Sequence, residues 1–123
     1  MTRRVHARVT LRTAGRLVGT AAALGAMVLW AIFVFRNPYG PPAVGRLFTF
    51  GGLNMFCALV AAGAAARGAH VGMYLLFFVS FFPVGLNAML GPGIFAGIGW
   101  LNLVYLAAAV LVHRGIGTAR RSG

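Results

Sequence analysis

The longest uncharged stretch of this 123-residue chain limits its folding more than any other feature. Between Arg67 and Arg114 lie 46 residues without Asp, Glu, Lys or Arg. As one helix they would extend about 69 Å, whereas the hydrocarbon core of a bilayer is about 30 Å thick. The chain therefore has to turn within this stretch. We expect the turn at "GPG", residues 91–93, because glycine permits positive φ and proline favours a turn.

Composition places the chain in a membrane. Hydrophobic residues make up 60% and charged residues 9% of it, whereas soluble domains carry about 25% charged residues. A soluble core of this size cannot bury so much apolar surface. We therefore expect an all-α integral membrane protein with four transmembrane helices in an antiparallel bundle with short loops. The four spans are expected at residues 16–35, 47–66, 71–90 and 94–112.

The regions outside the spans are basic or rich in turn-forming residues. Residues 1–15 are expected to form a basic leader, 16–113 the bundle and 114–123 a basic tail. The first apolar segment has about 19 residues, longer than the 7–15 of a typical signal peptide, so we expect it to be retained. Pro83 lies inside the third span and predicts a kink, with a moving hinge as the alternative.

All 11 charged residues are arginines, giving a formal net charge of +11. With four spans, nine of them fall on the side of both termini, and only Arg36 and Arg46 on the other. The positive-inside rule then predicts a plasma (inner) membrane protein with both termini in the cytoplasm. A pI near 12 also occurs in nucleic-acid-binding proteins, but these arginines crowd the ends of apolar segments, so no nucleic acid is expected as a partner.

The leader has a regular arginine pattern. Arg4, Arg8, Arg12 and Arg16 recur every four residues, which on a helix places them on one face of about 120°. On a helix, these candidate lipid-contacting arginines would lie along the anionic lipids of the inner leaflet, gaining about 1 kcal/mol per arginine. The favoured interpretation is a tail, with or without fixed structure, that only directs insertion, and an acidic partner protein is a third.

Four polar residues lie within the apolar segments and form a candidate intramembrane polar layer. Counted from the helix ends at about 1.5 Å per residue, Asn54, Ser80 and Asn102 fall near the midplane, and Asn87 shares a helix face with Ser80. Small residues surround them at helical spacing. One interpretation is hydrogen bonding that holds helices together, worth about 0.6–2 kcal/mol per bond. The other is a polar path or ligand site.

The absent residue types exclude several classes of function. Intramembrane carboxylates usually carry proton or cation coupling, and the chain has no Asp or Glu. Without an acid, no catalytic triad can be assembled, so we expect no enzyme and no catalytic residues. His70 and His113 are expected simply to meet water at the membrane boundary, and Cys57 to be a packing residue. No metal site and no cofactor are expected.

These patterns predict a non-enzymatic accessory or assembly subunit that packs against a membrane-protein partner or a second copy of itself. The alternative is an oligomeric channel or facilitator for a small solute. Its path would use Asn54, Ser80, Asn87 and Asn102, without carboxylate-based proton coupling.

Overall fold

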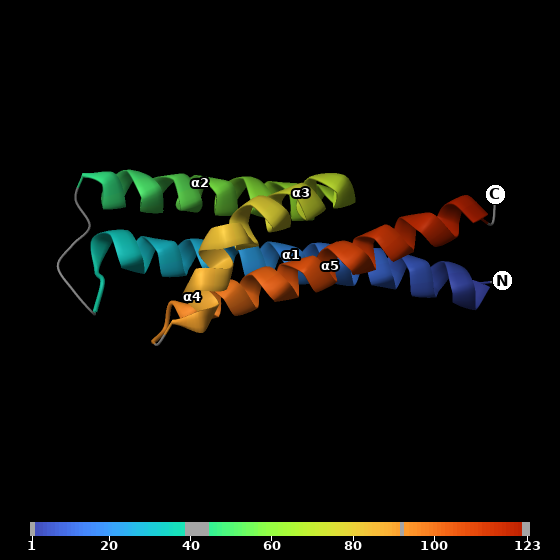
Figure 1. Ribbon diagram of the computed structural model, residues 1–123. Coiled ribbons are helices and arrows are strands. Elements are labelled where there is room, and N and C mark those ends of the chain that lie inside the picture. Colours follow the sequence, from blue (N-terminus) through green and yellow to red (C-terminus); the bar gives the residue numbers. More distant parts are fainter. Residues whose placement is uncertain (1, 39–44, 92, 122–123) are drawn as a thin grey trace.

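The computed structural model describes residues 2–38, 45–91 and 93–121, leaving aside the side chains of 2–9, Leu47, Pro83 and 116–121. It confirms the expectation of an all-helical chain, since the described residues contain no strand (Figure 1). In chain order the elements are α1 Thr2–Phe35, α2 Arg46–Arg67, α3 His70–Ser80, a π-helical turn η1 Phe81–Gly85, α4 Leu86–Leu90 and α5 Ala96–Arg121.

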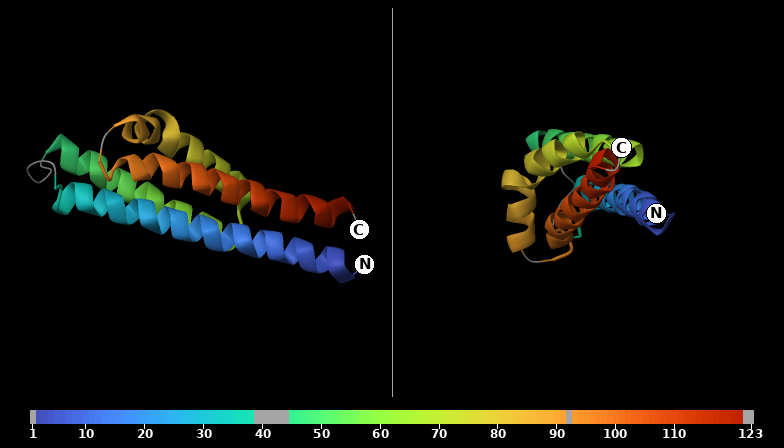
Figure 2. Two further views of the ribbon diagram at one scale, coloured as in Figure 1. Left: turned by 90° about the horizontal axis from the view of Figure 1, so that it is seen from below. Right: turned by 90° about the vertical axis from the view of Figure 1, so that its right-hand side faces the viewer.

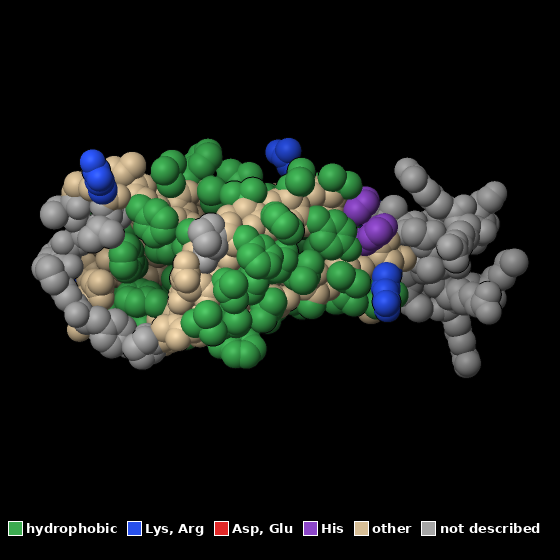
Figure 3. Space-filling view, viewed as in Figure 1, with side chains coloured by type: hydrophobic (Ala, Val, Ile, Leu, Met, Phe, Trp, Pro, Cys, Tyr) green, Lys and Arg blue, Asp and Glu red, His purple; other side chains and the backbone are tan. Residues whose placement is uncertain are grey.

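Three helices are long and apolar enough to cross a membrane. The apolar stretches are Thr10–Phe35 in α1, Phe48–Arg67 in α2 and Ala96–Gly115 in α5. Helix α1 packs against both α2 and α5, and the chain ends of α1 and α5 lie at the same end of the molecule (Figures 1 and 2). Between the ends drawn in grey, apolar side chains are spread over the face seen in Figure 3, and many large apolar residues are exposed.

The leader and the first apolar segment form one continuous helix. Helix α1 has 34 residues, or about 51 Å at 1.5 Å per residue, so it is longer than a hydrocarbon core of about 30 Å. About the first 14 residues of α1 therefore extend beyond the stretch that one crossing needs.

The third apolar segment differs from the single span expected over residues 71–90. Phe82 has non-helical dihedrals, φ −108° and ψ 118°, because the ring of the following Pro83 disfavours the helical region for the residue before it. Helix α3 has only 11 residues, about 16 Å, which is roughly half of a crossing. After the break, α4 runs across the long helices instead of along them (Figures 1 and 2).

Glycine and alanine form the contacts between the long helices. A Cβ atom on Gly19 would lie 2.9 Å from Met73 Cε and 3.0 Å from Ala65 Cβ, so α1 approaches α2 and α3 closely there. Gly51 of α2 meets Val34 of α1 in the same way. The apolar core that results is built mainly from alanine: Ala22, Ala23, Ala61, Ala62, Ala65, Ala108 and Ala109.

The turn after α4 needs glycine at one position. Gly93 has φ 92°, whereas Gly91 has φ −84° and ψ 162°, an extended conformation that any residue adopts. Replacing Gly93 with valine should therefore cost about 1–2 kcal/mol of stability, and replacing it with asparagine less. Thermal unfolding in detergent measures both. Gly91→Val is the matched control, and an equal loss at both positions would contradict the assignment of strain to Gly93.

Candidate functional site

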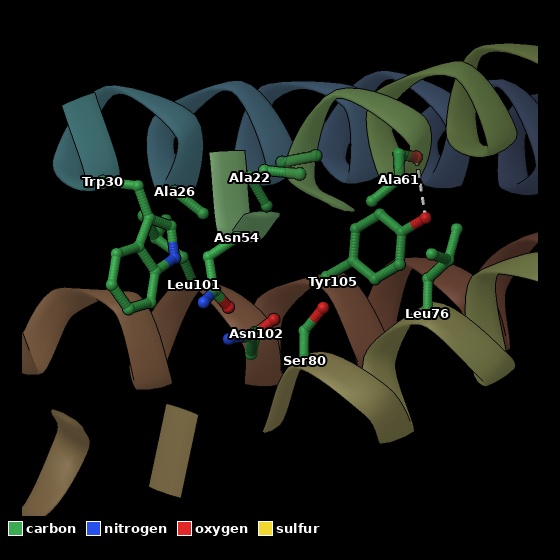
Figure 4. A pocket seen from close by; sticks show the side chains of 12 residues that line it. Ala22, Ala26, Trp30, Asn54, Ala61, Leu76, Ser80, Leu101, Asn102 and Tyr105 are labelled. Atoms are coloured by element: carbon green, nitrogen blue, oxygen red, sulfur yellow. Dashed lines mark hydrogen bonds between the residues drawn. The ribbon is translucent and has the colours of Figure 1, made fainter. Parts of the chain in front are cut away.

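Three of the four residues of the predicted polar layer lie around one small cavity. Asn54 of α2, Ser80 of α3 and Asn102 of α5 line it together with Trp30 of α1 and Tyr105 of α5 (Figure 4). The cavity measures about 20 Å³, which is room for about one water molecule. Its remaining walls are apolar: Ala22, Ala23, Ala26, Ala58, Ala61, Leu76 and Leu101.

Asn87 lies apart from this cavity. It lines a separate and wider hollow, whose other walls include Trp30, Phe95 and Ile98. The reason is the break before Pro83: Ser80 precedes it and Asn87 follows it, so the two residues no longer share the face of one straight helix. The four residues named from the sequence are therefore not one layer in the structure.

The two asparagine amides are held by their own helices. Asn54 Nδ2 donates to the Phe50 carbonyl at 2.8 Å, and Asn102 Nδ2 donates to the Ile98 carbonyl at 3.0 Å. Each amide oxygen is left for the cavity, and in Figure 4 both point into the same space as the Ser80 hydroxyl. The lining therefore offers hydrogen-bond acceptors and also donors, because each amide keeps a second N–H and Ser80 carries a hydroxyl. A single water molecule, which brings two donors, matches it in size and chemistry.

Tyr105 supplies a direct hydrogen bond between helices at this depth. Its ring is buried, and its hydroxyl donates to the Ala61 carbonyl of α2 at 2.7 Å (Figure 4). The sequence analysis did not single out this residue. Its position in the sequence could have marked it as a candidate. Tyrosines gather at membrane interfaces, so a tyrosine in the middle of an apolar segment is unusual.

The π-helical turn η1 and α4 lie close to α5 around Asn102. A Cβ atom on Gly85 would lie 2.8 Å from Asn102 Nδ2, and a Cβ atom on Gly99 would overlap Met89 of α4. Only glycine leaves enough room at both positions. The π-helical turn and α4 are thus packed directly on α5, beside the cavity.

Two of the three histidines, His70 and His113, lie together near the end of the apolar body that carries the chain termini (Figure 3). The rings of His70 and His113 are nearly parallel with centroids 4.7 Å apart, and the Tyr74 hydroxyl lies 3.2 Å from His113 Nδ1. Within the described residues, no three His, Cys, Asp or Glu side chains form a group that could hold a metal ion. Cys57 is partly buried in α2.

The leader arginines that the structure describes lie against the end of α2. Arg16 Nε donates to the Ala66 carbonyl at 2.8 Å, and the Arg12 guanidinium lies beside Gly68, which ends α2 in a left-handed conformation. Basic side chains commonly bind the last carbonyls of a helix in this way. The side chains of Arg4 and Arg8 lie outside the described part of the chain.

Fold and cavity together define a class: an all-helical protein with three helices able to cross a membrane and a small polar cavity between its helices. No family model, curated protein or solved structure matches the chain.

Proposed function

We propose that this protein is a non-enzymatic accessory or assembly subunit that packs against other proteins in a plasma membrane. The observation that carries the proposal is the size of the polar cavity, about 20 Å³. A solute path needs continuous polar space, whereas this cavity has room for about one water molecule. One N–H of each asparagine amide donates to a carbonyl of its own helix, so these two bonds order the cavity wall but do not join helices.

We further propose that α3, η1 and α4 enter the membrane as a fourth, discontinuous segment, which completes a four-segment bundle with both termini in the cytoplasm. Non-helical backbone at membrane depth is tolerated where protein covers it. The packing of Gly85 and Gly99 between this segment and α5 provides such cover. The arginine distribution supports the orientation.

Cysteine labelling in intact cells tests this topology. In a Cys57→Ala background, single cysteines at exposed Gly45 and Gly93 should react with a membrane-impermeant maleimide. A cysteine at exposed Ala69, between α2 and α3, should react only after the membrane is opened. Labelling at position 69 but not at 45 or 93 would contradict the orientation.

Asn102→Leu separates a structural role from a transport path. If the asparagine is structural, the variant should lose about 0.5–3 kcal/mol of bundle stability, the usual range for a destabilising point substitution. Proteoliposomes of wild type and variant should then both be as permeable to water, urea and ammonium as protein-free liposomes. Stopped-flow light scattering measures the permeability, and unfolding in detergent measures the stability. Asn87→Leu, outside the cavity, is the control. A wild-type flux that Asn102→Leu abolishes without loss of stability would overturn the proposal.

A positive test uses photo-cross-linking in the native membrane. Phe78 is 65% exposed on α3, so a photoreactive residue there samples the neighbours of the bundle. An accessory subunit should give one discrete adduct with a different membrane protein. Adducts with lipid alone, or only with a second copy, would contradict a subunit role in a larger complex.

One feature favours a second candidate function, a facilitator for a small solute. The helix break at Phe82 lies close to the polar cavity, and discontinuous helices beside a midplane site are typical of transporters. In this alternative, movement of α4 would enlarge the cavity within an oligomer of identical chains. The flux measurement above distinguishes the two candidates.

A further inference from the structure

The arginines of this protein have almost no counter-charge within the chain. The sequence contains no Asp or Glu, so no acidic side chain of the chain can pair with an arginine. Arg12, Arg16 and Arg67 gather where α2 ends. The end of α2 contributes only about half a negative charge, and the start of α3 at His70 contributes about half a positive one. The cluster therefore carries a net positive charge that an external anion can approach.

A groove lies beside this cluster of arginines. Thr13, Arg16, Leu17 and Thr20 of α1 and Ala66 of α2 line it, and its volume is about 380 Å³. The bond from Arg16 Nε to the Ala66 carbonyl holds the guanidinium at the groove wall, which leaves the terminal nitrogens of Arg16 as donors. Arg12 follows one helical turn away on the side of the chain terminus. Phosphate oxygens are the acceptors that such a fork of donors fits.

We propose that this groove binds the phosphate of one anionic phospholipid, with Arg16 as its main ligand and Arg12 beside it. The site is more specific than general attraction to an anionic leaflet, and it does not depend on the role of the protein as a subunit. From Arg16 to Phe35 the helix rises about 28 Å, close to the thickness of a hydrocarbon core. Arg16 therefore lies at the level of the lipid headgroups.

The surface next to the groove favours a lipid over a free phosphate or an acidic protein. Leu17 is 67% exposed, and Leu24 and Val28 continue an exposed apolar strip along the same face of α1 towards the membrane centre. An acyl chain covers such a strip, whereas inorganic phosphate leaves it open. A soluble acidic segment would reach the arginines but not the part of the strip that lies within the hydrocarbon core.

The proposal is tested with the purified full-length chain and phosphatidylglycerol as the probe. In native mass spectrometry, wild type should retain one phosphatidylglycerol at least about tenfold more tightly than phosphatidylcholine, and the lipid should raise the melting temperature. Arg16→Gln should weaken retention about tenfold. Arg114→Gln removes the same charge near the same end of the molecule but outside the groove, and should change retention less than about twofold.

Further variants and probes separate lipid binding from a loss of stability and from binding of free phosphate. Arg16→Gln also removes the bond to Ala66, so its effect on lipid retention could come from a loss of stability. Arg12→Gln is therefore measured as well. It should weaken lipid retention without a loss of stability in lipid-free detergent. Equal weakening by Arg114→Gln and Arg16→Gln would mean diffuse attraction and would overturn the site. If inorganic phosphate or glycerol 3-phosphate raised the melting temperature as much as phosphatidylglycerol does, the assignment to a phospholipid would be overturned.

Discussion

Replacing Gly15 with valine is expected to lower the free energy of unfolding by about 3 kcal/mol, the upper part of the usual range for overpacking. A Cβ atom at this position would lie 2.7 Å from the Ala108 carbonyl oxygen and 2.9 Å from the Val112 backbone nitrogen of α5. Backbone atoms cannot rotate away as a side chain can. The substitution therefore has to push α1 and α5 apart along their contact.

Gly63 provides the matched control for this prediction. It also lies inside an apolar helix, but a Cβ atom there would meet nothing within 4 Å. Gly63→Val should stay within about 0.5 kcal/mol of wild type. Unfolding of both variants in mixed micelles, followed by circular dichroism, gives the comparison. A similar loss at both positions would show that valine disturbs the helix itself and not the contact between α1 and α5.

The apolar parts of the three long helices follow largely from the sequence, although α1 begins at Thr2 and α5 ends at Arg121, both beyond the expected spans. Arginines and the loop rich in proline and glycine bound the apolar stretches, and the structure has long helices where the first, second and fourth spans were expected. Gly15, Gly19, Ala22 and Ala26 recur at helical spacing on α1, which is typical of a packing face, and all four are buried. Periodicity is informative here because close helix contacts in membranes select small residues at helical spacing.

The course of the third segment could not be read from its composition. Pro83 predicts a disturbance, but a kinked span and a broken one look alike in sequence. The direction of α4 depends on where Gly85 and Gly99 allow it to rest on α5, and such a contact between distant residues has no local signal.

Contacts between distant residues also decided which residues of the candidate site could be predicted from the sequence. Counting depth along straight helices brought Asn54, Ser80 and Asn102 to one level, and they line one cavity. Asn87 was expected to share a helix face with Ser80, and it lies outside this cavity because it follows the break. Tyr105 was missed because the importance of its hydroxyl depends on a carbonyl 44 residues away in the chain, on another helix.

Tyr105 is expected to hold the cavity wall mainly through its ring. Tyr105→Ala should cost about 3–5 kcal/mol, the range for removing a buried aromatic side chain. Tyr105→Phe keeps the ring and removes only the bond to the Ala61 carbonyl, so it should cost about 0.6–1.7 kcal/mol. The carbonyl belongs to a helical residue, so it keeps its bond within α2 in the phenylalanine variant. Equilibrium unfolding in mixed micelles measures both losses.

The control for Tyr105→Phe is Tyr74→Phe, which removes a hydroxyl near His113 at the end of the molecule. Water is available there to replace the lost partner, so the cost should be under about 0.5 kcal/mol. If Tyr105→Phe were as damaging as Tyr105→Ala, the hydroxyl and not the ring would hold α2 and α5 together. The bond to Ala61 would then be a main polar contact between helices, because the bonds that the Asn54 and Asn102 amides donate to Phe50 and Ile98 lie within their own helices.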